Sequence, residues 1–339
     1  MTKKFNGVML PQRILPVPNS ISPEAQESLH SHVGPDGVPR NSLIVMPPPE
    51  DFKAWKQIQS QAEAWYASVN NIKMATVRSS SEIKQIGNAT LHVATPETTL
   101  FKDGVLIDLH GGALIFGGGN ACRDSTLLQA HQHGILSYGI DYRMPPEYPY
   151  PAALDDCMEV YRYILEKHTA KNVVICGRSA GGNLASAMLI RAHEEGLQKP
   201  AALILLSPQV DLTESGDTFQ HNRLADVVLP DSLMSSNLLY AAGVPLTHPY
   251  LSPLLGDLSK GFPPTFLQSG TRDLFLSNTV RMHRELRRSK VHAELHVFEA
   301  MPHGGFGGAP EDFELNEEIN RFILTQLNLT SVEAAYNEV

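Results

Sequence analysis

Short apolar runs alternate with longer amphipathic stretches from about residue 75 to residue 330. The runs are rich in Val, Ile and Leu and have the length of β-strands, whereas the stretches repeat apolar residues every three or four positions, as helices do. We expect strands over residues 90–94, 105–110, 135–142, 172–176, 201–206, 265–268 and 293–298. Helices are expected over residues 125–133, 152–168, 180–195, 278–289 and 311–327. This alternation predicts an α/β fold in which helices cover both faces of a mostly parallel sheet.

Two segments interrupt the alternation. The first fifty residues are rich in Pro, Ser and Gly, with a short helix expected over residues 23–32 and a longer helix over residues 54–69. The second segment, residues 212–260, is irregular and partly helical. We therefore predict an N-terminal extension or cap at residues 1–74, a core made of residues 75–211 and 261–330, a cap insertion at residues 212–260 and a tail at residues 331–339.

Charge and cysteine usage narrow the possible partners and the compartment. Lys and Arg total 27 and Asp and Glu total 36, so the formal net charge is −9, and no basic block favours a nucleic acid partner. The three cysteines, Cys122, Cys157 and Cys176, cannot all pair, and none has the spacing of a metal or redox motif. We expect a reducing, cytoplasmic location. No run of 18 apolar residues predicts a membrane span, and the first residues make a poor secretion signal, although removal of a leader stays open.

A candidate nucleophile lies between an expected strand and the helix that follows it. Gly177-Arg178-Ser179-Ala180-Gly181 matches the Gly-x-Ser-x-Gly pattern of a sharp strand-to-helix turn. Such a turn raises the Ser179 hydroxyl above the sheet, and the small flanking residues let strand and helix approach. The pattern also arises by chance in loops, but the flanking elements argue for the nucleophile interpretation.

A glycine-rich turn follows the strand expected over residues 105–110. His110-Gly111-Gly112-Ala113 lets backbone N–H groups point at an oxygen that becomes charged, and Ala180, after the candidate nucleophile, is expected to supply a further N–H. A plain glycine turn is the alternative; a phosphate loop is excluded because its glycine spacing is absent. We expect His110 to orient this loop and Gly117-Gly-Gly119 to keep it flexible.

The candidate base and acid follow the last two expected strands. His303 lies in Met301-Pro-His303-Gly-Gly and Asp273 lies in Gly270-Thr-Arg-Asp273. The chain order Ser, Asp, His is the order typical of α/β-hydrolases, and loops at the carboxyl ends of parallel strands converge at one sheet edge. Asp211, also at a strand end, is the rival acid, whereas Asp155 and Asp156 are interpreted as ion-pair partners, with Arg143 as one candidate.

Together these motifs resemble the hormone-sensitive lipase family, in particular its bacterial esterases, over about residues 75–330. The resemblance rests on six segments: His110-Gly-Gly-Ala113, Asp141-Tyr-Arg-Met-Pro-Pro-Glu147 with Pro151-Ala-Ala-Leu-Asp-Asp156, Gly177-Arg-Ser-Ala-Gly-Gly182, Ser252-Pro-Leu-Leu255, Gly270-Thr-Arg-Asp273 and Met301-Pro-His303-Gly. It implies an α/β-hydrolase fold with a mostly parallel eight-stranded sheet and a cap. It also implies oxyanion donors at Gly112, Ala113 and Ala180, with Gly111 as a further candidate, and an Arg143–Asp156 pair.

Two departures from the family pattern stand out. Ala113 occupies the place of a usual third glycine, which limits backbone freedom there, and the N-terminal extension is longer and richer in proline than is typical. Within the family the sequence leans toward members similar to monoterpene lactone hydrolases and xenobiotic-ester hydrolases.

The expected activity is hydrolysis of small to medium apolar esters through an acyl-enzyme, with Ser179, His303 and Asp273 as triad and without metal or organic cofactor. Aromatic and aliphatic residues expected in the cap suggest an apolar pocket: Phe52, Trp55, Trp65, Phe116, Leu229 and Tyr240. Lactone or amide hydrolysis uses the same triad and stays open, as does a non-catalytic ligand-binding relative. A homodimer is possible.

Overall fold

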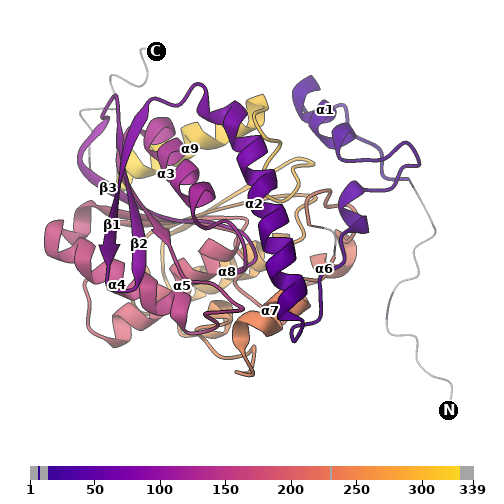
Figure 1. Cartoon of the computed structure of the whole chain (residues 1–339). Helices are drawn as coiled ribbons and strands as arrows, with labels where there is room; N and C mark the ends of the chain where they lie inside the picture. The colour runs from indigo at the N-terminus through magenta and orange to yellow at the C-terminus, as the bar shows by residue number, and fades with distance from the viewer. Residues whose placement is uncertain (1–6, 8–13, 230, 329–339) are drawn as a thin grey trace.

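A computed structural model describes residue 7, residues 14–229 and residues 231–328 (Figure 1). The predicted tail at residues 331–339 lies outside the described residues. No helix among the described residues is long and apolar enough to cross a membrane.

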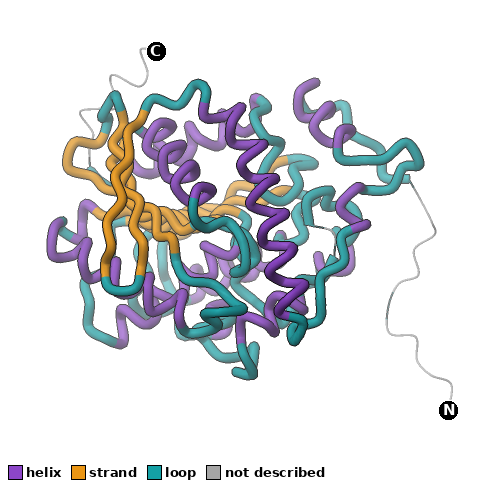
Figure 2. Tube along the Cα trace, viewed as in Figure 1, coloured by secondary structure: helices purple, strands orange, loops and turns teal. Residues whose placement is uncertain are grey.

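The strands form one eight-stranded sheet in the order β1-β2-β4-β3-β5-β6-β7-β8, whose strands are drawn in orange in Figure 2. The first three strands in this order pair antiparallel, and all later neighbours pair parallel. The strands are β1 Ser79–Ile86, β2 Ala89–Pro96, β3 Phe101–Leu109, β4 Ile135–Asp141, β5 Val173–Arg178, β6 Ala202–Leu206, β7 Thr265–Gly270 and β8 Ala293–Phe298. The expected mostly parallel, eight-stranded sheet is therefore confirmed.

Helices cover both faces of this sheet, which buries the central strands on two sides. One apolar core lies between the sheet and the helices α4 Ala152–Lys167, α5 Ala180–Glu194 and α8 Leu276–Arg288. On the opposite face α9 Pro310–Gln326 packs against β3, β5, β6 and β7, and α3 Asn120–His133 packs against β2 and β4. Burial on both sides explains why these strands are continuous apolar runs.

The N-terminal segment and the residues before β7 both contact loops that follow strands, since Trp55 packs against Ile115 and Leu29 against Met301, and the N–H of Leu274 donates to Asp226. The N-terminal segment contains α1 Pro23–Ser31, the 3-10 turn η1 Arg40–Leu43 and α2 Phe52–Met74, which crosses the front of the molecule in Figure 1. Residues 212–260 contain α6 Thr218–His221, α7 Met234–Ala241 and the 3-10 turn η3 Pro253–Leu255, and a further turn, η2 Ala170–Asn172, precedes β5.

The pattern of apolar residues did not reveal β1. Its side chains are mostly exposed or half-buried because it is the edge strand, so no alternation of apolar and polar residues marks it. Backbone pairing with β2 holds it instead, through a hairpin in which Gly87 has φ +57. The helix expected over residues 54–69 is also longer than expected and continues to Met74.

Candidate active site

Ser179 lies at the sharp turn between β5 and α5, with φ 54 and ψ −119. Two glycines make this turn possible. A Cβ on Gly181 would lie 1.9 Å from the carbonyl oxygen of Leu109, and a Cβ on Gly177 would lie 2.5 Å from the carbonyl oxygen of Gly181. The start of α5 thus lies so close to β3 and β5 that only glycine fits at positions 177 and 181. This close contact holds the Ser179 backbone in its strained conformation.

The structure brings the three predicted side chains into one hydrogen-bonded chain. Nε2 of His303 lies 2.9 Å from Oγ of Ser179, and Nδ1 of His303 lies 3.0 Å from Oδ1 of Asp273. Asp273 follows β7, and His303 lies in the loop after β8. All three residues are buried. Three loops far apart in the sequence therefore meet at the carboxyl edge of the sheet, as the parallel strand order predicts.

Hydrogen bonds and charges set the protonation of this chain. Burial alone would lower the pKa of His303, but the negative charges of Asp273 and Asp226 and the hydrogen bond to Asp273 raise this pKa above its usual 6.5. Burial opposes ionisation of Asp273 too, yet the His303 charge and hydrogen bonds from His303, Ser269 and the Phe275 N–H lower its pKa. The imidazole thus has one nitrogen toward Ser179 and one toward a carboxylate.

Asp226 is a buried acid beside this chain that sequence reasoning missed. Its Oδ1 accepts the N–H groups of Val228 at 2.9 Å, Leu229 at 3.1 Å and His303 at 3.3 Å, and its Oδ2 accepts that of Leu274 at 2.8 Å. Burial and the nearby Asp273 charge raise the pKa of Asp226 to about 6. The segment before β7 is thereby joined to both loops that carry the candidate acid and base. Its bonds to Val228 and Leu229 are those of a local turn, whereas no pattern in the sequence indicates its bonds to the distant backbone groups of Leu274 and His303.

The predicted oxyanion loop passes close to Ser179. A Cβ on Gly111 would lie 3.2 Å from Cβ of Ser179, and Gly112 has φ +121, with its carbonyl accepting the N–H groups of Ile115 and Phe116. Ala113 has a left-handed backbone with φ 54. Among the described residues, no acceptor is recorded for the N–H groups of Gly111, Gly112, Ala113 and Ala180. These four N–H groups therefore remain candidates for the oxyanion donors.

The structure corrects the expectation that Gly117-Gly-Gly119 only adds flexibility. Gly117 has φ +91, and a Cβ there would lie 2.6 Å from the carbonyl oxygen of Gly111. Gly119 precedes α3 with φ 60 and donates its N–H to Asp141. These glycines therefore have specific steric and hydrogen-bonding roles in the loop.

His110 also contacts this loop. Its Nδ1 lies 2.8 Å from the carbonyl oxygen of Gly111, and its ring stacks on Tyr142 with 4.1 Å between centroids. This geometry agrees with the expectation that His110 orients the loop.

The rival acid Asp211 has other partners. Its carboxylate accepts hydrogen bonds from Arg281, Thr213 and Ser215, and no contact with His303 is recorded within the described part of the chain. The expected Arg143–Asp156 pair is present, with Nη2 of Arg143 2.7 Å from Oδ1 of Asp156.

Apolar side chains line the side of the oxyanion loop that faces the insertion. Ala113 and Leu229, both half-buried, pack against a buried cluster of four residues: Phe219, Leu233, Leu274 and Phe275. The Phe275 ring meets the His303 ring edge-on, with 4.9 Å between centroids. The site therefore has an apolar wall next to its polar chain.

The six residues expected to form an apolar pocket do not share one place. Trp55 and Tyr240 are fully buried, whereas Trp65 is 59% exposed and Phe52 is 54% exposed. Of the remaining two, Phe116 packs beside Trp55, and Leu229 belongs to the apolar wall. Of the three α2 residues in this set, Trp55 alone is packed, and Phe52 and Trp65 face solvent.

Two groups of side chains in the described residues have ligand atoms close enough to hold a metal ion. One is Asp226, Asp273 and His303, whose atoms already bond to one another or to backbone N–H groups. The other is His110, Cys122 and Asp141, which lies behind the oxyanion loop.

Comparisons with known proteins agree with this geometry. The model of a family described as having the alpha/beta hydrolase fold matches residues 106–306. An esterase of Acinetobacter venetianus is 30% identical over 234 residues, which cover 68% of this chain and 72% of that protein.

Two solved structures are similar along nearly the whole chain. The crystal structure of an esterase called E25 has 33% identity and a TM-score of 0.88, covering 95% of this chain and 99% of its own. An esterase from the bacterial hormone-sensitive lipase family has 25% identity and a TM-score of 0.78, covering 90% and 99% of the two chains.

Proposed function

Because the chain belongs to the hormone-sensitive lipase-like branch of the α/β-hydrolase fold family and is a carboxylic ester hydrolase, we propose that Ser179, His303 and Asp273 form its catalytic triad. The observation that carries this proposal is the continuous chain from Oγ of Ser179 through both imidazole nitrogens to the Asp273 carboxylate, with separations of 2.9 and 3.0 Å.

In the first step, Oγ of Ser179 attacks the ester carbonyl carbon while Nε2 of His303 accepts the hydroxyl proton. Asp273 holds the imidazole in the tautomer with a proton on Nδ1 and stabilises the imidazolium that forms. This role requires an ionised carboxylate, and the lowered pKa of Asp273 supports it. His303 then protonates the departing alcohol, which leaves an acyl group on Ser179.

The carbonyl oxygen becomes negative in the tetrahedral intermediate. We assign the N–H groups of Gly112, Ala113 and Ala180 as its donors, with Gly111 as a further candidate. The N-terminus of α5 adds its partial positive charge at the same place. The loss of one such donor typically raises the activation barrier by about 3–4 kcal/mol, so each of these backbone N–H groups is expected to contribute substantially to the rate.

Water then attacks the acyl-enzyme, with His303 as the base, and the acid product leaves. Every proton in the two steps moves between Ser179, His303, water and the leaving alcohol. The proposed mechanism therefore requires neither a metal nor an organic cofactor.

We propose esters of small to medium apolar acids or alcohols as the substrates. The apolar wall formed by Ala113, Leu229 and the cluster around Phe275 supports this class, because burial of a substrate against it releases water. We further propose that the N-terminal segment and residues 212–260 form the cap over this wall.

Ser179→Ala tests the triad. We expect hydrolysis of p-nitrophenyl butyrate to fall by at least about a thousandfold, because triad losses cost orders of magnitude, while the circular dichroism spectrum stays unchanged. Ser186→Ala is the matched control, since Ser186 is a buried serine of α5, the helix that begins directly after Ser179, and its Oγ donates to the Gly182 carbonyl. A Ser179→Ala variant within about tenfold of the wild type would exclude the proposal.

A fluorophosphonate probe provides a second test that does not depend on the choice of ester. We expect a single covalent adduct on Ser179 that is absent in Ser179→Ala and retained in Ser186→Ala. Labelling at another serine would contradict the assignment. A panel of p-nitrophenyl esters of rising chain length, together with lactones, then tests the proposed substrate class.

A further inference from the structure

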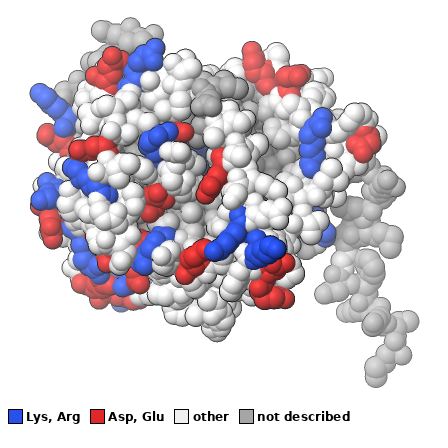
Figure 3. All heavy atoms as spheres, in the orientation of Figure 1, with Lys and Arg blue, Asp and Glu red and all other residues white. Residues whose placement is uncertain are grey.

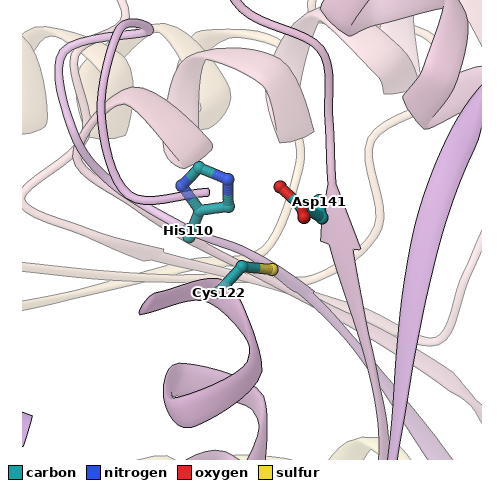
Figure 4. Close-up of side chains that lie close together, drawn as sticks. All are labelled: His110, Cys122 and Asp141. Carbon is teal, nitrogen blue, oxygen red and sulfur yellow. The ribbon is translucent and has the colours of Figure 1, made fainter. Parts of the chain in front are cut away.

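His110, Cys122 and Asp141 converge behind the oxyanion loop, and the ester chemistry uses none of their side chains (Figure 4). They come from three elements: His110 follows β3, Cys122 lies in the first turn of α3, and Asp141 ends β4. One ligand atom of each residue, a ring nitrogen, a thiol sulfur and a carboxylate oxygen, lies within 4.8 Å of the other two.

His110 is oriented as a metal ligand would be. Its Nδ1 lies 2.8 Å from the Gly111 carbonyl and therefore carries the proton, which leaves a lone pair on Nε2. In metal sites, histidine ligands usually donate their second N–H to such a carbonyl. His110 is only 4% exposed, and Nε2 has no hydrogen-bond partner among the described residues. Figure 4 shows the Nε2 side of the ring turned toward Asp141.

Asp141 and Cys122 supply the other two ligand atoms of the group, a carboxylate oxygen and a sulfur. Asp141 accepts the Gly119 N–H at 3.0 Å, which fixes its carboxylate. Cys122 is a buried free cysteine whose sulfur points toward Asp141 in Figure 4. Burial and the charges of Asp141 and Asp108 raise the pKa of the Cys122 thiol, so a bound ion has to displace the thiol proton.

His92 on β2 contacts the carboxylate of this group. Its Nε2 lies 3.7 Å from Oδ2 of Asp141, and neither of its buried ring nitrogens has a hydrogen-bond partner in the described part of the chain. Three buried imidazole nitrogens near Asp141, Nε2 of His110 and both ring nitrogens of His92, thus have no hydrogen-bond partner within the described residues. Unsatisfied buried polar atoms on this scale require a physical explanation, and a bound ion is one.

An ion could reach this place from solvent. A cavity of about 360 Å³ opens between α2 and the loop after the oxyanion residues, and Asp141, Gly117, Gly118 and Gly119 are part of its lining. Asp141 thus has one side toward the cavity and the other toward the buried imidazole and thiol.

We propose that His110, Cys122 and Asp141 bind a divalent transition metal ion of the zinc class. Mixed nitrogen, sulfur and oxygen donors in a compact buried group suit a tetrahedral Zn²⁺, whereas Mg²⁺ and Ca²⁺ prefer oxygen alone. Binding releases the proton of the Cys122 thiol. The bound ion joins the loop after β3, the start of α3 and the end of β4, and it stabilises the backbone from which the oxyanion donors extend.

Titration of the purified full-length protein with Co²⁺ tests this site, because Co²⁺ replaces Zn²⁺ and reports on its ligands. We expect one equivalent to bind, with a sulfur-to-cobalt charge-transfer band in the near ultraviolet and displacement by Zn²⁺. Cys122→Ser should abolish the band and weaken Co²⁺ binding by more than about tenfold. Cys157→Ser is the matched control, since Cys157 is also free and buried but lies on α4 outside the group.

Binding without the charge-transfer band, or a band that persists in Cys122→Ser, would overturn the proposal, as would the absence of stoichiometric binding to the wild type. If Cys122→Ser does not fold, Asp141→Asn tests the site through Co²⁺ affinity, which should fall by more than about tenfold while the sulfur-to-cobalt band remains, and unchanged affinity would overturn the proposal. Ester hydrolysis is not the readout, so a failure of this site is distinguishable from a failure of the proposed triad.

Discussion

At the residue scale, sequence motifs identify some side chains of the candidate site and miss others. Ser179, Asp273 and His303 could be predicted because each follows a recognisable strand within a short pattern. Asp226 could not, since it binds backbone N–H groups of Leu274 and His303, whose positions only the folded chain determines. Its charge also contributes to the raised pKa of His303.

Asp226→Asn should therefore alter the pH dependence of hydrolysis. In the wild type, kcat/KM falls as pH drops through the pKa of His303, which lies above 6.5, because only the neutral imidazole accepts the Ser179 proton. Removal of the Asp226 charge lowers this pKa, so the acidic limb should move to lower pH.

Asp211→Asn is the control for this pH profile, because Asp211 is an equally buried acid that pairs with Arg281. Its acidic limb should stay in place. If Asp226→Asn reduces kcat without moving the acidic limb, Asp226 has a purely structural role and the electrostatic explanation is wrong.

At the element scale, α2 connects the N-terminal segment to the oxyanion loop. Trp55 is fully buried against Ile115 and Leu239, and its Nε1 donates to the Pro48 carbonyl at 2.9 Å. Gln59, one turn later, donates to the carbonyls of Ile115 and Pro145. The three-and-four spacing of apolar residues predicted this helix but not which of its two tryptophans packs, because both fit the pattern.

Trp55→Ala should lower the free energy of unfolding by about 3–5 kcal/mol, since it leaves a large cavity next to Ile115. Trp65→Ala is the matched control in the same helix, and because Trp65 is 59% exposed we expect a change within about 0.5 kcal/mol. Urea unfolding followed by circular dichroism measures both. Equal losses for the two variants would show that α2 packs differently.

At the scale of the whole molecule, distant parts of the chain are joined around the site. Ser22 donates through its N–H and its Oγ to Glu311 of α9, each at 2.7 Å, and α1 packs against the loop that carries His303 through Leu29, Met301 and Phe306. Acidic and basic side chains are interspersed over the face seen in Figure 3. The core could be predicted from its periodic pattern, whereas these long-range contacts lack any periodic signal.

Glu311→Ala should loosen α1 without unfolding the core. The loss of two hydrogen bonds to a carboxylate is worth about 1.5 kcal/mol or more, so amide hydrogen exchange over Ala25–Ser31 should accelerate by about tenfold. Glu314→Ala, an exposed glutamate of the same helix, is the control. Unchanged exchange in Glu311→Ala would show that the apolar contacts of α1 alone hold it.

The bonds of Asp226 have a practical consequence for chimeras between relatives. If residues 212–260 form the proposed cap, their exchange as a block transfers the selectivity of the donor, but it also replaces the carboxylate that bonds the backbone of Leu274 and His303. A crossover placed after Leu229 would separate the two effects. Residues 212–229 lie outside the α/β core in the sequence, but through Asp226 they are hydrogen-bonded to the loops that carry Asp273 and His303.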